Sequence, residues 1–224
     1  NYTNNGNLNL ASIGNLTDLI FSGGDVTLNG SGTLTLSNYT TNRLSGALST
    51  DRLINFNTIR GSGQIGLNLL GLVNHGLVEA NQSQPLIVDP SGTGAINDGT
   101  LRATNNATLT LQGGTFANAG GLIEAQTGSL VQLSSATVTG GDVTIASGGL
   151  LQLDNSTLTS GNVALTSTGK LQTASGSNTL GGTVTNPVGG IIQVGNNTNL
   201  TLLASGNYTN NGNLNLASIG NLTD

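Results

Sequence analysis

Acidic side chains are the first residues in this 224-residue sequence that could carry out chemistry. Ten Asp and Glu residues accompany five Lys and Arg residues and a single histidine. Enzymes that cleave polysaccharides gather acids, usually with Arg or Lys, in one groove. Here the acids are scattered, and only Glu79 and Glu124 share a position in a repeated pattern, with Arg102 between them. This arrangement indicates a surface column of stacked charges, so we expect no catalytic residue and no enzyme.

The sequence contains few side chains that could form a metal site or a histidine-based catalytic site. His75, the only histidine, stands in an Asn-His-Gly turn, where we expect a solvated corner residue. The chain has no cysteine, which excludes disulfides and Cys-based metal sites. Gly-Gly-Asp occurs at 23–25 and 140–142 without the GGxGxD spacing of calcium-binding repeats. We therefore expect neither a metal nor a cofactor.

Charge and hydropathy also limit the partners. Nucleic-acid binding depends on many Lys and Arg side chains facing phosphates, and five basic residues in 224 predict no nucleic-acid partner. The longest apolar stretch, 65–73, is far shorter than the roughly 20 residues that cross a bilayer. The sequence therefore predicts no membrane span.

One segment, 37–60, departs from the rest in composition. It contains three of the five basic residues and two aromatic side chains: Tyr39, Arg43, Arg52, Phe56 and Arg60. One interpretation is a long irregular coil with a loop or a short helical excursion. The other is a lateral contact surface, recurring once per long repeat, at which the protein binds itself or a ligand.

The residues discussed above lie within a short sequence repeat, whose strands and corners determine their positions. Apolar residues alternate, as at Leu151 and Leu153, which indicates strands with one buried face. Glycine pairs such as Gly140-Gly141 separate the strands and suit sharp corners, because glycine adopts backbone angles that other residues avoid. The clearest units follow one another at steps of 20 and 21 residues: GDVTIASGGLLQL (141–153), GNVALTSTGKLQT (161–173) and GTVTNPVGGIIQV (182–194).

Related units of less regular length extend this pattern along the chain. Short strands in coils of about 23 residues, each stacked on the next, predict an all-β, right-handed parallel β-helix (β-solenoid). At about 4.8 Å per coil, nine coils rise roughly 43 Å. Nine coils per 206 residues are predicted to begin near Tyr2, Val26, Phe56, Val73, Ile96, Phe116, Val143, Val163 and Val184.

The middle strand of each coil predicts an outward polar column. One polar residue lies between two buried apolar positions, so successive coils stack these residues one strand spacing apart. The first members alternate in charge, and the later amides are suited to a ladder. The predicted members are Glu79, Arg102, Glu124, Gln152, Gln172, Gln193 and Asn215.

The two ends of the chain share eighteen letters. NYTNNGNLNLASIGNLTD occupies both 1–18 and 207–224, which gives a period of 206 residues. We interpret 1–206 as one full β-solenoid period and 207–224 as the start of the next identical period. We expect the chain to be a piece of a longer one.

The coils resemble those of a known family. The stretch INDGTLRATNNATLTLQGGTFANAGGLIEAQTGSLVQLSSATVTGGDVTI is similar in texture to the repeats of filamentous-haemagglutinin-type adhesins. These are giant two-partner-secreted bacterial proteins with right-handed β-helical shafts. The resemblance covers about 54–216, and the secretion domain of that family is not visible. It implies an extracellular, cell-surface location and a role in adhesion or matrix building.

We therefore expect a structural segment of a secreted bacterial cell-surface fibre or adhesin, a stiff rod for adhesion, matrix or sheath building. Its expected partners are further copies of itself, stacked end to end or bundled laterally, and carbohydrate or a host or neighbouring cell surface. Two alternatives remain open. One is a carbohydrate-binding or carbohydrate-cleaving β-helix, which converging acids or stacked aromatics in a groove would favour. The other is an end-to-end polymer of separate subunits.

Overall fold

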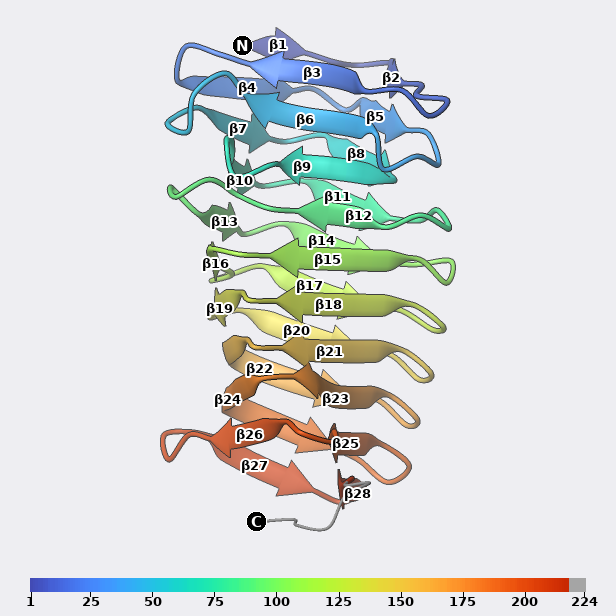
Figure 1. Cartoon of the computed structure of the whole chain (residues 1–224), viewed down its shortest axis with the longest axis vertical. Coiled ribbons are helices and arrows are strands. Elements are labelled where there is room, and N and C mark those ends of the chain that lie inside the picture. Colours follow the sequence, from blue (N-terminus) through green and yellow to red (C-terminus); the bar gives the residue numbers. More distant parts are fainter. Residues whose placement is uncertain (218–224) are drawn as a thin grey trace.

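The computed structural model describes residues 1–217 as strands joined by turns and loops in one continuous stack (Figure 1). Three strand segments follow one another in each turn of the chain, and ten turns lie one on another between the two ends. We call the three stacks of strands face 1, face 2 and face 3, in the order in which the chain visits them. The fold is therefore the predicted β-solenoid.

The strands divide among the faces as follows. Face 1 contains β1 (Tyr2–Thr3), β4 (Asp25–Asn29), β7 (Arg52–Asn55), β10 (Gly71–Asn74), β13 (Ala95–Asn97), β16 (Thr115–Ala117), β19 (Thr137–Thr139) and β26 (Asn199–Leu202). Face 2 contains β2 (Asn7–Leu10), β5 (Thr33–Leu36), β8 (Thr58–Gly61), β11 (Leu77–Ala80), β14 (Thr100–Ala103), β17 (Leu122–Ala125), β20 (Asp142–Ile145) and β27 (Asn207–Asn210). Two strands bend round the corner between faces 1 and 2 and serve both, β22 (Thr157–Leu165) and β24 (Ser177–Asn186). Face 3 contains β3 (Thr17–Phe21), β6 (Asn42–Gly46), β9 (Gly63–Gly66), β12 (Leu86–Val88), β15 (Thr108–Gln112), β18 (Leu130–Ser134), β21 (Leu150–Asp154), β23 (Lys170–Ser175), β25 (Ile191–Val194) and β28 (Asn213–Leu216).

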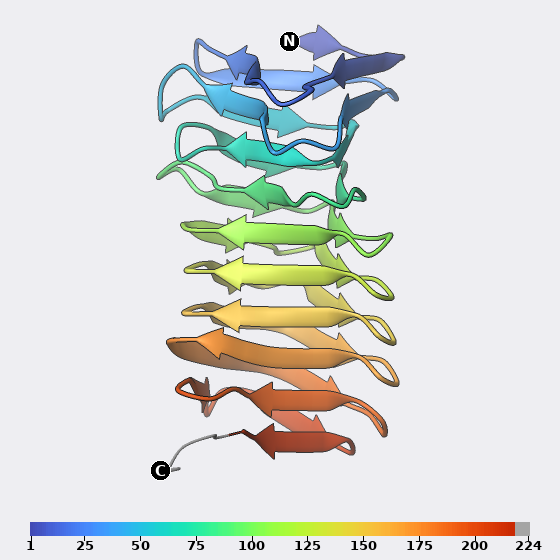
Figure 2. The same ribbon diagram turned by 45° about the vertical axis from the view of Figure 1, so that its right-hand side comes forward.

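The strands pair in parallel with their counterparts in the neighbouring turns, so the strands of turns 2–9 have partners on both edges. In Figure 1 the strands of face 2 run from left to right behind the stack, and those of face 3 return from right to left in front as the chain descends. This path is right-handed, the hand that parallel crossover connections prefer. Figure 2 shows the same stack from a second side, with loops projecting at its edges.

The core consists of apolar columns that run the length of the stack. On face 2, the residues Leu34, Ile59, Val78 and Leu101 pair in register and are fully buried. Their neighbours in each strand point outward, as the period of two requires. Full burial of one such side chain contributes about 1.5–3 kcal/mol, so the columns supply the main cohesion between turns.

The long repeat does not close on a whole number of turns. Tyr2 lies on face 1 of turn 1, and Tyr208 lies on face 2 of turn 10, so 206 residues span nine turns and one further face. The predicted coil starts change face between Phe116, on face 1, and Val143, on face 2. The sequence units around these two residues have the same apolar alternation, although they bend round different corners. The predicted nine coils per 206 residues are therefore one face short of the observed length of the repeat.

Segment 37–60 is more regular than predicted. It contains β6, β7 and most of β8, which pair in register with neighbouring turns. Alternate residues of β6 are buried, which is the strand period of two. The irregular parts are the loops 37–41 and 47–51, and the segment contains no helix. Of the two predicted forms of irregularity, the segment has the loop and not the helical excursion.

Candidate functional site

A column of alternating charges lies on the outside of face 2. Arg102 donates two hydrogen bonds to Glu79 Oε1, from Nε at 3.0 Å and from Nη2 at 2.6 Å. Glu79 is only 8% exposed, so its charge is largely withdrawn from water and is balanced by the arginine one turn on. The members that stack in register are Arg60, Glu79, Arg102 and Glu124. Arg60 thus extends the charged part of the predicted column by one strand.

The amides predicted for that column lie on face 3 instead. Beyond Glu124, face 2 continues with Thr144. On face 3, the amide Nε2 of Gln172 donates to Gln152 Oε1 at 3.0 Å. The stack that contains this bond is Gln132, Gln152, Gln172, Gln193 and Asn215. A single column from Glu79 to Asn215 is therefore wrong, because the aligned sequence units change face between turns 6 and 7.

The residues of the predicted lateral surface are distributed around the rod. Arg43 lies on face 3, Arg52 on face 1 and Arg60 on face 2, because segment 37–60 makes almost one full turn. Tyr39 lies in the loop between faces 2 and 3, and Phe56 lies at the corner between faces 1 and 2. These five side chains consequently point in different directions and do not form one contact surface.

Two of these arginines link successive turns. Arg43 donates to both carboxylate oxygens of Asp18, and Arg52 does the same to Asp25, with bond lengths of 2.6–2.8 Å. Such bidentate pairs are stronger than single hydrogen bonds between neutral groups. The arginine hydrogen bonds lower the pKa of Asp18 and of Asp25 below the usual value. Arg43 therefore links turns 1 and 2, and Arg52 links turns 2 and 3.

A third carboxylate closes the loop 47–51. Asp51 is buried, and its two oxygens accept hydrogen bonds from the backbone N–H groups of Gly24, at 2.7 Å, and Leu48, at 2.8 Å. These backbone hydrogen bonds, that of Gly24 first, lower the pKa of Asp51. The ionised carboxylate thus joins this loop to the turn before it.

His75 lies at the surface of the corner between faces 1 and 2, where it contacts two other turns. Its Nδ1 lies 2.6 Å from Asp98 Oδ1, one turn further along the chain. Its ring stacks on Phe56 of the preceding turn, with centroids 4.5 Å apart and an angle of 22° between the planes. The expected corner residue is therefore a link between three turns.

The most extensive polar site is buried inside this same corner. The amides of Asn55, Asn74 and Asn97 each donate from Nδ2 to Oδ1 of the asparagine one turn further on, at 2.8, 2.7 and 2.6 Å. Asn118 is the last acceptor, and all four side chains are at most 1% exposed. Further amide hydrogens donate to backbone carbonyl oxygens of the corner. Buried amides need such partners, and here the neighbouring turn supplies them. We call these four residues the asparagine ladder.

Glycines beside the asparagine ladder let the turns approach each other. A Cβ on Gly121 would lie 2.4 Å from Asn97 Nδ2, and a Cβ on Gly141 would lie 1.9 Å from the carbonyl oxygen of Asn118. No side chain fits at either distance. The sequence pattern did not predict this ladder. The sequence feature that could have predicted it is the Asn-x-Gly triplet, which occurs at Asn74 and again at Asn97. One such triplet indicates a turn, but two at the spacing of one coil place the asparagines in neighbouring turns.

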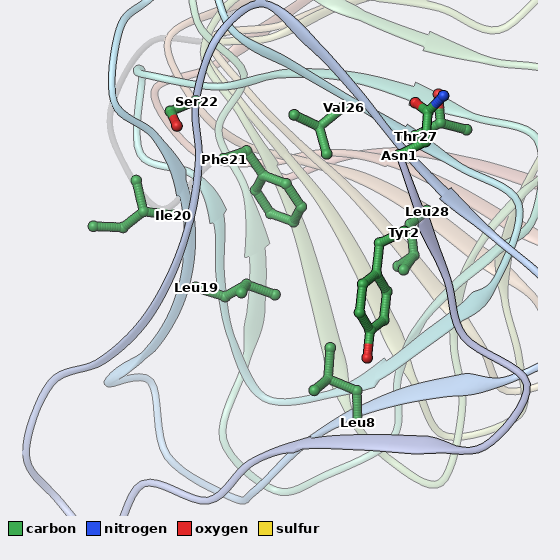
Figure 3. A pocket seen from close by; sticks show the side chains of 10 residues that line it. All are labelled: Asn1, Tyr2, Leu8, Leu19, Ile20, Phe21, Ser22, Val26, Thr27 and Leu28. Atoms are coloured by element: carbon green, nitrogen blue, oxygen red, sulfur yellow. The ribbon is translucent and has the colours of Figure 1, made fainter.

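The N-terminal end of the rod is an open apolar hollow (Figure 3). Its volume is about 470 Å³, and the side chains of Tyr2, Leu8, Leu19 and Phe21 point into it from the strands of turn 1. Tyr2 remains 54% exposed. An open strand edge above an exposed apolar interior is a surface on which further strands pair.

The C-terminal end has the same character. A hollow of about 290 Å³ is lined by Val184, Ile192 and Leu214 among other apolar residues. Leu216, at the end of β28, is 75% exposed. Both ends of the described rod therefore present apolar interiors and unpaired strand edges.

No protein-family model, curated protein or solved structure matches this chain. Its fold and its repeated contacts define the class, a parallel β-solenoid repeat protein. Residues 1–217 contain no helix with the length and apolar character needed to cross a membrane.

Proposed function

We propose that this chain is a structural segment of a secreted bacterial cell-surface fibre or adhesin of the filamentous-haemagglutinin type. One observation carries the proposal: the sequence 1–18 recurs at 207–224, and residues 207–216 continue the stack as its next strands. In a solenoid each repeat contacts its neighbours, so a tandem repeat of this kind extends the rod by stacking one copy on the next. The segment acts as a stiff shaft and not as a catalyst.

The contacts between turns support a mechanical role. Backbone pairing joins each turn to the next, and the asparagine ladder and the ion pairs add further links along the axis between some of the turns. Several of the acidic groups are engaged in these links, as Glu79 is with Arg102 and Asp18 is with Arg43. Load along the rod is therefore distributed over many parallel hydrogen bonds.

The extracellular location and the adhesive role come from the resemblance of the coils at 96–145 to adhesin repeats. The proposed partners are further copies of the rod, and carbohydrate or the surface of a host or neighbouring cell. A chain with only 7% charged residues suits close lateral packing of such rods.

Antibodies raised against the 224-residue chain test this function on intact cells of the source organism. We expect immunogold labels along filaments outside the cell, and a denatured antigen many times larger than the 22.3 kDa of this chain. Antibody absorbed with the purified chain is the control. Antigen confined to the cell interior would contradict the proposal. Surface antigen of about 22 kDa would instead indicate separate subunits that polymerise end to end.

A further inference from the structure

The same ten residues occupy different faces at the two ends of the rod. Residues 1–10 contain β1 on face 1 and β2 on face 2, whereas residues 207–216 form β27 on face 2 and β28 on face 3. The strands of the first copy are paired on the edge that faces the C-terminal end of the rod, with β4 and β5. The strands of the second copy are paired on the edge that faces the N-terminal end of the rod, with β24 and β25.

Together the two ends show all the strand pairings that an internal copy of this segment would make. The pairs at the two edges are Tyr2–Leu28, Leu8–Leu34, Val184–Tyr208 and Ile192–Leu214. Because one edge is used at each end, both sets form at once without conflict. A junction between two copies therefore repeats these pairings and adds one that the structure does not contain, that of the second copy's β3 with β26 on face 1.

We infer that a second copy of the 206-residue repeat docks on the C-terminal end of the first and is turned by one face of the solenoid. The second copy's β4 pairs with β27, which lies on face 2, whereas β4 of the first copy lies on face 1. Each further copy is turned by one more face, and every third junction restores the starting face. This inference rests on the proposed function, since it specifies how successive copies of the rod join.

The corners of the solenoid are similar enough for such a change of face. The unit 114–125 bends between faces 1 and 2, and the unit 141–153, which has the same sequence pattern, bends between faces 2 and 3. Their turns, 118–121 and 146–149, each close with a backbone hydrogen bond of 2.8 Å between the first and fourth residues. One kind of sequence unit thus serves both corners.

The asparagine of the duplicated segment also functions at both corners. Asn4, between faces 1 and 2, donates from Nδ2 to Asn57 Oδ1 at 3.0 Å. Asn210 is the same residue one repeat later and lies at the end of β27 on face 2, where it accepts a hydrogen bond from Asn186 Nδ2 at 2.7 Å. Asn4 is buried and Asn210 is exposed, but each makes a hydrogen bond to an asparagine of another turn, so the residue can link turns at either corner.

The offset distributes the surface of the repeat around the rod. A feature that occurs once per repeat, such as the charge column that begins at Arg60, appears on each of the three faces in turn. Successive copies advance by nine turns and one face, which is about 45 Å at 4.8 Å per turn. A long rod consequently presents the same lateral contacts in three directions.

Disulfide trapping in a two-copy protein, residues 1–206 followed by 1–224, tests the junction. The chain has no cysteine of its own, so introduced pairs are unambiguous. Thr185→Cys combined with Thr209→Cys joins neighbours in register on face 2, at a separation that a disulfide spans. Thr201→Cys combined with Thr209→Cys is the matched control, because Thr201 lies on face 1. We expect the first pair to oxidise completely and the second to remain reduced. The reverse result would mean that the copies dock in phase and would overturn the inference.

Gold labelling supplies a second readout that needs no disulfide. A four-copy protein with Gln132→Cys carries one half-exposed label site per copy on face 3. With 1.4 nm gold at each site, we expect labels on three sides in turn, about 45 Å apart along the rod, with the fourth label above the first. Labels along one side would overturn the one-face offset and leave the fibre proposal standing. Absence of filaments on cells would overturn the fibre proposal and leave the offset standing.

Discussion

The buried asparagine ladder and the glutamine stack of face 3 use the same amide chemistry in opposite surroundings. Asn55, Asn74, Asn97 and Asn118 are almost fully buried, and each contact between them is 2.6–2.8 Å long. The glutamines of face 3 are half-buried, and the contact from Gln172 to Gln152 is 3.0 Å. Water can replace a partner on the face but not in the corner.

The difference shows where the register of the turns is fixed. A buried amide that loses its partner costs about 1–3 kcal/mol, because desolvation is not compensated. A half-exposed amide recovers most of its hydrogen bonding from water and contributes little. The asparagine ladder therefore selects one stacking register, whereas the glutamine stack tolerates change. Matched substitutions in the two regions test this distinction.

The largest effect is expected for Asn97→Asp. The change keeps the shape of the side chain and replaces the Nδ2 donor by a carboxylate oxygen, which then faces Asn118 Oδ1 at 2.6 Å. Burial of an uncompensated charge in this corner should destabilise the fold by about 3 kcal/mol or more at pH 7. Denaturant unfolding measures the loss, and hydrogen exchange should place it in turns 4–6.

The acid form supplies the control for this variant. Protonation of the introduced carboxyl restores a donor, so Asn97→Asp should regain stability as the pH is lowered toward 5. Asn97→Ala has no group to protonate and should not recover. Equal stability of Asn97→Asp and the unchanged chain at pH 7 would show that the ladder does not fix the register.

An intermediate effect is expected from acid acting on the first three turns. The pKa of Asp18, Asp25 and Asp51 is lowered in the fold by arginine or backbone hydrogen bonds. Their stabilisation is therefore present above roughly pH 4, the unfolded value, and is lost as the pH falls below it. The glutamine stack does not titrate. Hydrogen exchange in turns 1–3, corrected for its intrinsic rate, should accelerate several-fold more than in turns 7–9 between pH 6 and pH 3.

The triple variant Asp18→Asn, Asp25→Asn and Asp51→Asn is the matched control for this measurement. It should be less protected than the unchanged chain at pH 6 and should show little further loss at pH 3. If the unchanged chain loses protection equally in both groups of turns, charge pairing is not what distinguishes them.

The comparison also explains which features the sequence could predict. Alternation such as Leu151 and Leu153, with glycines at the corners, predicts stacked strands because a period of two has only one buried face. The face on which each unit lies was not predictable, since the units at Phe116 and Val143 look alike but bend round different corners. For this reason the predicted outward column joined two faces.

The candidate sites show the same limit. The pairing of Glu79 with Arg102 follows from stacking alone, because both units lie on one face. The scattering of Arg43, Arg52 and Arg60 depends on how many faces segment 37–60 covers, which composition does not reveal. Buried asparagines were missed because polar residues are expected outside, and only the spacing of Asn-x-Gly indicates a ladder.

The smallest effect is expected for Gln172→Glu, the same amide-to-acid change on face 3. The variant replaces the Nε2 donor that bonds Gln152, but both side chains are half-buried and water can supply the missing partner. We expect a loss of about 0.5 kcal/mol or less in denaturant unfolding, within the range of cross-strand surface pairs. A loss as large as that of Asn97→Asp would mean that the outer stack also fixes the register. The ratio of the two losses therefore measures how much of the stacking specificity lies in the buried corner.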